Sequence, residues 1–445
     1  MRTVAPEALD GARLSLVDTA WLHMEMPNNL MMVGGLAFFD EPLDRDRLIK
    51  VLEQRLLNHP RFRQRIGGSL VGPPAWVPDP LFDLDAHVHR IALPAPGGND
   101  ELRTLAGDLM STPLDMSRPL WDAHLIENHR SRAAMLIRIH HCIADGTALV
   151  RVLLGLTSPT AAGSLRALRR SPTPAPASDH HRLAQLDPRR AAGDLIQLGA
   201  HIYTLARLTT LWPDPSTSLR GGLVRTKRVA WTEPFPLENL RPLRRDGGYT
   251  VNDILVTAVT GALRSHIRRA TERVPKRIRA LVPVDMRPDD DDGSLGNQFG
   301  LIFLDMPVGL RGRRQRLDAV HASMDAARHS PQPSVTFEVL GALGLVPRTV
   351  QRQVVRFFGT KGTSVVTNVR GPAEELYLAG KRLRNLTFFV PQSAMLGVGI
   401  SLMTYAGNIQ VGVIVDAGLV PEPERIARDV NAELRQLTRG EAGGR

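Results

Sequence analysis

Short apolar runs alternate with amphipathic segments along most of the chain. Residues 28–40 (NNLMMVGGLAFFD) and 133–141 (AAMLIRIHH) have the pattern of strands. Residues 43–60 (LDRDRLIKVLEQRLLNHP) have helical spacing, which Pro60 ends. Residues 400–415 (ISLMTYAGNIQVGVIV) predict two strands joined by the turn residues of Ala-Gly-Asn. The alternation indicates an α/β protein.

The composition changes after residue 157, where a segment rich in Pro, Ala, Ser and Arg begins. An amphipathic helix is predicted at 195–212, and a second alternating region follows. We therefore predict an N-terminal domain at 1–157, a linker with this helix at 158–223, and a C-terminal domain at 224–445. Two such layers would face each other across a cleft, which is a common place for a ligand.

Composition and charge narrow the class of protein. The chain has 445 residues, 43% of them hydrophobic, a net charge of +11 and a single cysteine, Cys142. A disulfide framework within the chain is excluded, and aromatic residues are too few, at 5%, to favour nucleic acid as a partner. No apolar run has the length of a membrane span, and residues 1–18 do not resemble a signal peptide, so we expect a cytoplasmic protein.

The stretch IRIHHCIADGTALV (137–150) carries the strongest candidate chemistry. In a strand, His140 and His141 point to opposite faces, so only one of them is expected in a small site. Asp145 is placed to cap the following helix, and Gly146 permits a tight turn. The residues alone leave three alternatives to catalysis by histidine: a structural histidine, a weak metal site, and a nucleophilic Cys142.

The motif and its companions resemble a known family. HHCIADG (140–146) is similar to the HHxxxDG signature of acyl-CoA-dependent acyltransferases. RPLWDAHLIE (118–127) and TVNDILVTAV (250–259) resemble elements of its bacterial wax ester synthase/diacylglycerol acyltransferase branch. Further similar elements are LSLVDTAWL (14–22), PVDMRP (283–288), GNQFG (296–300) and YLAGKRL (377–383). TNVRGP (367–372) departs from the branch, because Arg370 stands where a proline is typical.

The resemblance implies two chloramphenicol-acetyltransferase-like domains, each a mixed β-sheet with flanking helices, which face each other across a central tunnel. It implies transfer of a fatty acyl group from acyl-CoA to diacylglycerol or a long-chain alcohol, with His141 as the general base. Asn252 would stabilise the oxyanion or orient the acceptor. His140 and Asp145 complete the motif; we expect His140 to be structural.

The remaining candidate residues would support the motif. Asp145 is expected to pair with Arg287 and hold the motif loop. Gly146 and Asp253 are expected to support the local backbone, since Asn252 and Asp253 together have the pattern of a helix cap. The Pro119-Leu120-Trp121 element is expected to shape the wall beside the motif, with Trp121 in the core.

The resemblance also defines the expected partners. Acyl-CoA would be a co-substrate, with no bound cofactor, no metal and no nucleic acid. Arg311, Arg313, Arg314 and Arg316 are candidates for binding the phosphates of coenzyme A, beside the simpler interpretation of a solvated face. We expect peripheral contact with the inner membrane face or lipid droplets, through residues 337–359 or 195–212, although packing of these segments into the core is an equal alternative.

Other functions remain open from the sequence alone. One is an acyltransferase of the condensation or polyketide-ester type, which takes its donor from a carrier protein. Another is a non-catalytic lipid-binding protein of the same fold. His140 and Asp145 also match the short H-x4-D pattern of glycerolipid acyltransferases, but the other elements of the chain do not belong to that group.

Overall fold

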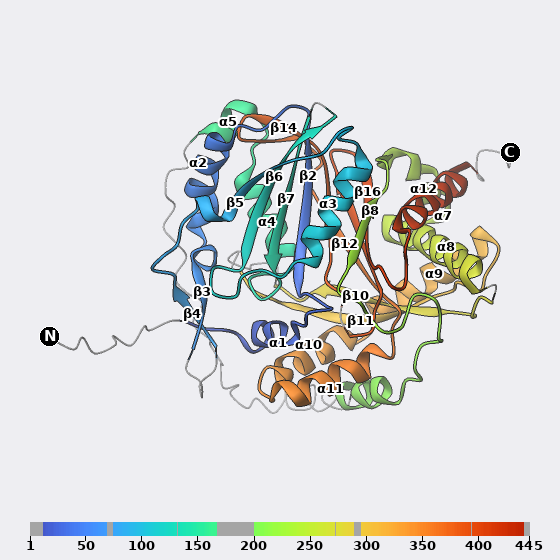
Figure 1. Ribbon diagram of the computed structural model, residues 1–445. Coiled ribbons are helices and arrows are strands. Elements are labelled where there is room, and N and C mark those ends of the chain that lie inside the picture. Colours follow the sequence, from blue (N-terminus) through green and yellow to red (C-terminus); the bar gives the residue numbers. More distant parts are fainter. Residues whose placement is uncertain are drawn as a thin grey trace.

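Two β-sheets form the centre of the molecule in the computed structural model (Figure 1), which describes residues 12–68, 74–130, 132–166, 200–271, 273–288, 295–392 and 394–439. The first sheet has six strands in the order β13-β14-β2-β7-β6-β5. Its strands are β2 (Met32–Phe39), β5 (Val88–Ala92), β6 (Trp121–His129), β7 (Arg132–His140), β13 (Leu376–Leu378) and β14 (Lys381–Phe389).

The second sheet is mixed and has seven strands, in the order β11-β10-β12-β15-β16-β8, with β9 beside β16. Its strands are β8 (Lys227–Trp231), β9 (Phe235–Pro236), β10 (Ile278–Asp285), β11 (Phe299–Met306), β12 (Ser364–Arg370), β15 (Val398–Tyr405) and β16 (Asn408–Asp416). A small third sheet joins β1 (Ala12–Arg13), β3 (Gln64–Gly67) and β4 (Ala75–Pro78).

Helices cover these sheets. In the part of the chain that the structure describes, they include α1 (Leu16–Met24), α2 (Arg45–Arg55), α3 (Asn99–Ser111), α4 (Gly146–Leu156), α5 (Ala161–Leu165), α7 (Arg241–Gly247), α8 (Val251–Thr271), α9 (Arg313–Arg328), α10 (Gln332–Leu343), α11 (Arg348–Gly359) and α12 (Pro423–Arg439). Residues 200–210 are also helical. Helices α8, α9 and α12 lie beside the second sheet, and α1 packs against α10 and α11 below it (Figure 1).

Two strands from the second half of the chain, β13 and β14, belong to the first sheet. β14 pairs antiparallel with β2, so residues 376–389 of the second half complete the sheet of the first half. The predicted limits 1–157, 158–223 and 224–445 did not anticipate this crossing and remain a prediction as domain boundaries. The α/β class with two mixed layers is confirmed.

Several local predictions match the structure. β15 and β16 form a hairpin whose turn residues, Ala406 and Gly407, have φ values of 45° and 73°. Positive φ at both central positions is the geometry that joins two strands with a right-handed twist. α2 begins at its cap Asp44, and the helical path ends in a 3-10 turn just before Pro60.

The two segments expected at a lipid surface have different outcomes. Residues 337–359 are not one helix, because the chain breaks between α10 and α11 at residues 344–347. Residues 200–210 of the segment 195–212 are helical, and residues 195–199 lie outside the described part. In the described ranges, we find no helix that combines the length and apolar character required to cross a bilayer.

Candidate active site

His141 lies at the junction of the two sheets, immediately after β7. His140 is the last residue of the strand, and the backbone amide of His141 donates to the carbonyl of Met31 at 2.7 Å. The imidazole stacks on Trp21 of α1, with 4.1 Å between ring centroids, and Phe299 lies 5.6 Å away at a tilt. The residue is only 8% exposed. Burial lowers the pKa of His141 below the ordinary 6.5, so the ring is neutral at neutral pH.

Asn297 determines which nitrogen of His141 carries the proton. Its amide nitrogen donates to a carboxylate oxygen of Asp18 at 2.7 Å and to the carbonyl of His141 at 2.7 Å. Its oxygen Oδ1 must therefore be the acceptor of the 2.8 Å contact with Nδ1 of His141. The proton lies on Nδ1, and Nε2 keeps its lone pair and makes no hydrogen bond to the residues that the structure describes. A neutral imidazole in this tautomer can accept a proton at Nε2.

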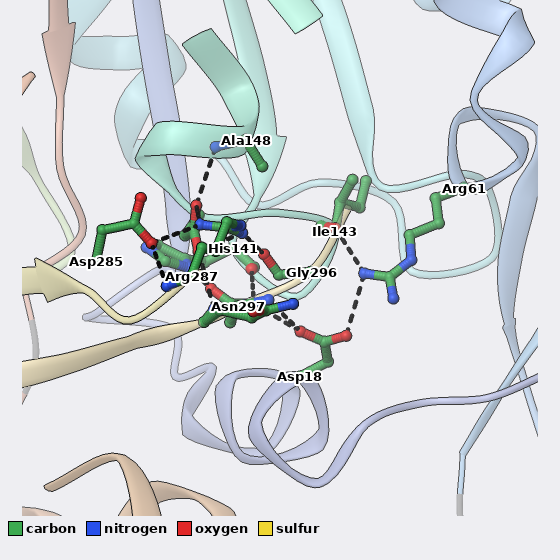
Figure 2. A network of polar contacts seen from close by, with 11 residues as sticks. Asp18, Arg61, His141, Ile143, Ala148, Asp285, Arg287, Gly296 and Asn297 are labelled. Carbon is green, nitrogen blue, oxygen red and sulfur yellow. Dashed lines mark hydrogen bonds and ion pairs between the residues drawn. The ribbon is translucent and has the colours of Figure 1, made fainter. Parts of the chain in front are cut away.

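Asp18 holds Asn297 in place from α1 (Figure 2). Oδ1 of Asp18 accepts from both the backbone amide of Asn297, at 3.1 Å, and its side-chain amide. Oδ2 lies 3.1 Å from the guanidinium of Arg61, which also donates to the carbonyl of Ile143 at 2.7 Å. Burial raises the pKa of Asp18, and Arg61 and Asn297 oppose this rise. The buried chain Arg61–Asp18–Asn297–His141 thus orients the imidazole.

Asp145 and Arg287 hold the motif loop as predicted. Asp145 caps α4 by accepting from the amide of Ala148 at 3.0 Å, and its other oxygen accepts from the amide of Gln298 at 2.9 Å. The guanidinium of Arg287 lies 2.8 Å from Asp145 and also donates to the carbonyl of Gly296 at 2.8 Å. One ion pair therefore connects the motif with the loop that carries Asn297 (Figure 2).

The backbone of that loop requires glycine at one position. Gly296 has φ +134°, which L side chains rarely adopt. Its carbonyl accepts from the amide of Asp145 at 3.3 Å. Gly146, the first residue of α4, has a different environment, because a Cβ there would lie in ordinary contact, 3.7 Å, with Val369 of β12.

His140 faces away from His141, as the strand alternation predicts, and has a structural position. Nδ1 of His140 accepts from the backbone amide of Cys142 at 3.1 Å, so its proton lies on Nε2, 3.4 Å from the carboxylate of Glu25. His140 is 2% exposed and Cys142 is 0% exposed. These contacts favour the expected structural role for His140 and give the Cys142 thiol no access to a substrate.

The Pro119-Leu120-Trp121 element packs behind the motif. The carbonyl of Leu120 accepts from the amide of His140 at 2.9 Å. Trp121 is 1% exposed, donates from Nε1 to the carbonyl of Phe62 at 2.9 Å, and stacks on His87 with 4.7 Å between centroids. The expected core role of Trp121 is confirmed by these contacts.

Asn252 and Asp253 lie in the first turn of α8, which begins at Val251. Asp253 and Thr250 form a reciprocal cap, with contacts of 2.8 and 3.2 Å, so a cap is present, but Asp253 forms it with Thr250 and not with Asn252 as predicted. Oδ1 of Asn252 accepts from the side-chain amide of Asn368 on β12. The next residue of β12, Val369, packs on Gly146. Asn252 and Gly146 of the motif therefore contact neighbouring residues of β12. The role of Asn252 toward substrate stays a prediction.

Two adjoining pockets approach the site. The smaller is apolar, about 70 Å³ in volume, and is lined by Trp21, Leu340, Val355 and other residues of β10, β11, α10 and α11. The larger, about 540 Å³, includes Met24, Met31 and Val355. Met24 and Val355 belong to both. His141 lines neither pocket, but Trp21 and Met31 do and also contact it. The central tunnel as a whole remains a prediction.

The arginine cluster proposed for coenzyme A phosphates is largely occupied by carboxylates. Arg316 is buried and lies 2.5 Å from Glu433, and Arg313 reaches the same carboxylate at 3.2 Å. Arg314 lies 3.6 Å from Asp318. These contacts favour the alternative interpretation of the cluster as a structural and solvated face.

A group with metal-ligand chemistry lies on β5 and β6. Ligand atoms of His89, Asp122 and His124 lie within 4.8 Å of one another. However, both oxygens of Asp122 accept from the guanidinium of Arg138, at 2.9 and 2.5 Å. The fixed cation opposes a metal ion there, so the group does not form a candidate metal centre.

Sequence reasoning missed four residues of the site, namely Asp18, Trp21, Arg61 and Asn297. Three of them lie within elements that were noted only for their resemblance: LSLVDTAWL contains Asp18 and Trp21, and GNQFG contains Asn297. A signal was present, because an Asp and a Trp three residues apart on a helix share one face. What the spacing did not show is that this face meets residues 296–300 beside His141.

Comparisons with known proteins agree with this architecture. A family model described as the wax ester synthase/diacylglycerol acyltransferase catalytic domain matches residues 14–255, and one described as the WS/DGAT C-terminal domain matches residues 295–438. A protein of Mycobacterium tuberculosis (strain ATCC 25618 / H37Rv) named "Probable diacyglycerol O-acyltransferase tgs1" is 30% identical and covers 95% of each chain. A second from that strain, "Probable diacyglycerol O-acyltransferase tgs2", is 29% identical and covers 94% of this chain and 97% of its own.

Solved structures share the fold. The wax ester synthase/diacylglycerol acyltransferase from Marinobacter aquaeolei VT8 superposes with a TM-score of 0.71 at 23% identity, covering 97% of this chain and 100% of that one. A trichothecene 15-O-acetyltransferase from Fusarium sporotrichioides has a TM-score of 0.65 at 10% identity, covering 98% and 99%. The chain belongs to the wax ester synthase/diacylglycerol acyltransferase family. It is therefore an acyltransferase, and the carrier-protein and non-catalytic alternatives are not favoured.

Proposed function

We propose that the protein transfers a fatty acyl group from acyl-CoA to the hydroxyl of diacylglycerol or a long-chain alcohol, with His141 as general base. The observation that carries the proposal is the hydrogen bond between Nδ1 of His141 and Oδ1 of Asn297, at 2.8 Å. Because it fixes the proton on Nδ1, Nε2 is the nitrogen available to the acceptor hydroxyl.

In the proposed step, Nε2 takes the hydroxyl proton as the oxygen attacks the thioester carbonyl. The tetrahedral intermediate then expels the thiolate of coenzyme A, and the imidazolium of His141 returns the proton to that sulfur. Asn297 and Asp18 stabilise the imidazolium, because Oδ1 of Asn297 accepts from its Nδ1 and the Asp18 carboxylate polarises the Asn297 amide. Asn252 is the proposed donor toward the oxyanion, through its side-chain nitrogen.

Two features support long apolar substrates. The smaller pocket is lined mainly by apolar side chains, and one of them is Trp21, which stacks on the imidazole. An acyl chain in this pocket would bring its thioester toward His141. Relatives of the family are named diacylglycerol O-acyltransferases, which supports diacylglycerol as an acceptor.

We also propose peripheral contact with a lipid surface on the cytoplasmic side, at the inner membrane face or a lipid droplet. The 200–212 segment and α11 expose large apolar side chains, among them Tyr203 (69%), Trp212 (83%) and Phe357 (45%). The turn between α10 and α11 adds Leu345, at 71% exposed. Exposed apolar surface of this kind is typical of interaction sites. Replacing Trp212 and Leu345 with serine should reduce flotation with lipid vesicles while leaving the unfolding midpoint unchanged.

The proposed reaction is tested with the purified full chain. Acyl-CoA donors of several chain lengths are crossed with diacylglycerol and long-chain alcohols, and the esters and released coenzyme A are quantified by mass spectrometry. The proposal predicts equimolar ester and coenzyme A for at least one acceptor class. A folded protein that binds acyl-CoA but yields no ester with any pair would overturn it.

A further inference from the structure

The larger pocket has a polar and basic mouth whose ligand is not defined by the chemistry at His141. It lies between α1, the segment 26–31, residues 221–223 and α11, and its volume is about 540 Å³. Arg352, Gln353 and Arg356 of α11 line one side, and Asn28 and Asn29 also line it. No carboxylate is among its lining residues in the part of the chain that the structure describes. The pocket therefore presents donors and positive charge to a ligand.

Arg352 and Arg356, the two arginines that line the pocket, are available to bind a ligand. Arg352 and Arg356 are exposed and, within the described ranges, neither lies within ion-pair distance of a carboxylate. They follow one another by four residues on α11, so their guanidinium groups project from the same side of the helix. This contrasts with Arg316, which is buried against Glu433 at 2.5 Å. The pocket arginines keep their full hydrogen-bonding capacity for an anion.

One lining residue of the pocket is hydrogen-bonded to the backbone of His141. Met31 lines it, and the carbonyl of Met31 accepts from the backbone amide of His141 at 2.7 Å. Met24 and Val355 are shared with the smaller apolar pocket, which Trp21 also lines. A ligand with an anionic end at the mouth and an apolar end in the smaller pocket would thus pass Met31 and Trp21, both of which contact His141.

We propose that Arg352 and Arg356 bind phosphate groups at this mouth, and that these phosphates belong to the coenzyme A part of the acyl donor. The inference rests on the proposed function and extends it, because it assigns the donor's entrance to α11. Guanidinium groups bind phosphate oxygens in a bidentate manner, and Gln353, Asn28 and Asn29 supply polar contacts for the arm between phosphate and thioester. The first few methylene groups of the acyl chain then lie in the apolar pocket, whose volume is about 70 Å³.

The test compares donors with and without phosphate. Arg352→Gln, Arg356→Gln and the double variant are assayed with acyl-CoA and with the matching acyl-pantetheine, which has the same thioester but no phosphate. The KM for acyl-CoA should rise about 10- to 100-fold in the double variant, as expected for loss of charge-assisted hydrogen bonds, and the kcat/KM for acyl-pantetheine should stay within about twofold. An unchanged KM for acyl-CoA, or equal losses with both donors, would overturn the proposal.

Two matched arginines serve as controls. Arg348 lies one turn earlier on α11 and does not line the pocket, and Arg435 is exposed on α12. Arg348→Gln and Arg435→Gln remove the same charge and should leave the KM for acyl-CoA within about twofold, because bound phosphate is contacted directly rather than through long-range charge. If Arg435→Gln raised the KM as much as Arg352→Gln, a contact at the pocket would be refuted.

Two further experiments distinguish coenzyme A phosphates from lipid phosphates. The first of them also tests the phosphate site independently of catalytic turnover. Calorimetry with adenosine 3′,5′-bisphosphate, the phosphate-bearing end of coenzyme A, should detect binding to the wild type that the double variant loses, even if no donor is turned over. Phosphatidylglycerol vesicles test lipid phosphates. If Arg352→Gln, Arg356→Gln and the double variant lost vesicle binding while the bisphosphate still bound the double variant, the arginines would serve a membrane and the proposal would fail.

Discussion

Replacing Asn297 with alanine tests how the imidazole is positioned. The change removes the acceptor of the Nδ1–H of His141, at 2.8 Å, and the donor to Asp18, at 2.7 Å. Both groups are buried, so the unpaired donor costs about 1–3 kcal/mol of stability. During catalysis the ring becomes charged, and a hydrogen bond to a charged group contributes about 1.5–3 kcal/mol, which corresponds to about a 10- to 150-fold loss of kcat/KM.

The assay is initial-rate ester formation at varied acyl-CoA, with wild type, Asn297→Ala, His141→Ala and the double variant. If Asn297 acts through His141, the double variant should be no slower than His141→Ala, because the two residues form one unit. Urea unfolding of each variant separates loss of rate from loss of fold. Multiplicative losses in the double variant, or wild-type kcat/KM in a folded Asn297→Ala, would refute the reasoning.

Three other predictions follow from the same contacts. Burial lowers the pKa of His141, so kcat/KM should stay level from pH 8 to 6.5 and decline only at lower pH. The free energy of unfolding should also fall at this lower pH, because the histidine of the unfolded chain is protonated before that of the folded protein. Arg287→Leu leaves the Asp145 carboxylate buried without its cation and should lower the free energy of unfolding by about 3–5 kcal/mol in urea titrations. Trp121→Phe removes the hydrogen bond to Phe62 and should cost about 1–3 kcal/mol in urea titrations, with kcat within a few-fold of wild type.

Each has an outcome that would contradict it. An inflection of kcat/KM at or above pH 6.5 would contradict the lowered pKa. The control for Arg287 is Arg277→Leu, which breaks an exposed pair with Asp305 and should cost less than about 1 kcal/mol; equal costs would contradict the burial argument. A stable Trp121→Phe variant without activity would give Trp121 a role beyond the core.

Local elements of the fold could be predicted from periodicity and turn chemistry. The strand ending at His140, the helix capped by Asp145 and the turn at Ala406–Gly407 follow from residues close together in sequence. The return of β14 to pair with β2 could not be predicted in this way, because strand pairing across more than three hundred residues depends on tertiary contacts rather than local pattern.

The candidate site likewise contains residues that the sequence predicted and residues that only the tertiary structure brings together. His141, Asp145 and Arg287 were predicted, the last through the family resemblance alone. The chain Arg61–Asp18–Asn297 was not predicted, because its members come from three distant segments and none has a spacing that reports their contact. Asn252 was expected near the oxyanion, and its one observed side-chain partner among the described residues is Asn368.

The most direct test of the central claim is the rate of ester formation by His141→Ala. The variant is compared with wild type at saturating acyl-CoA and acceptor, after circular dichroism and thermal unfolding have established that both are folded. A general base contributes about 10²- to 10⁴-fold, so kcat should fall by at least the lower of these factors. Turnover within a few-fold of wild type in the folded variant would contradict the assignment of His141 as the base.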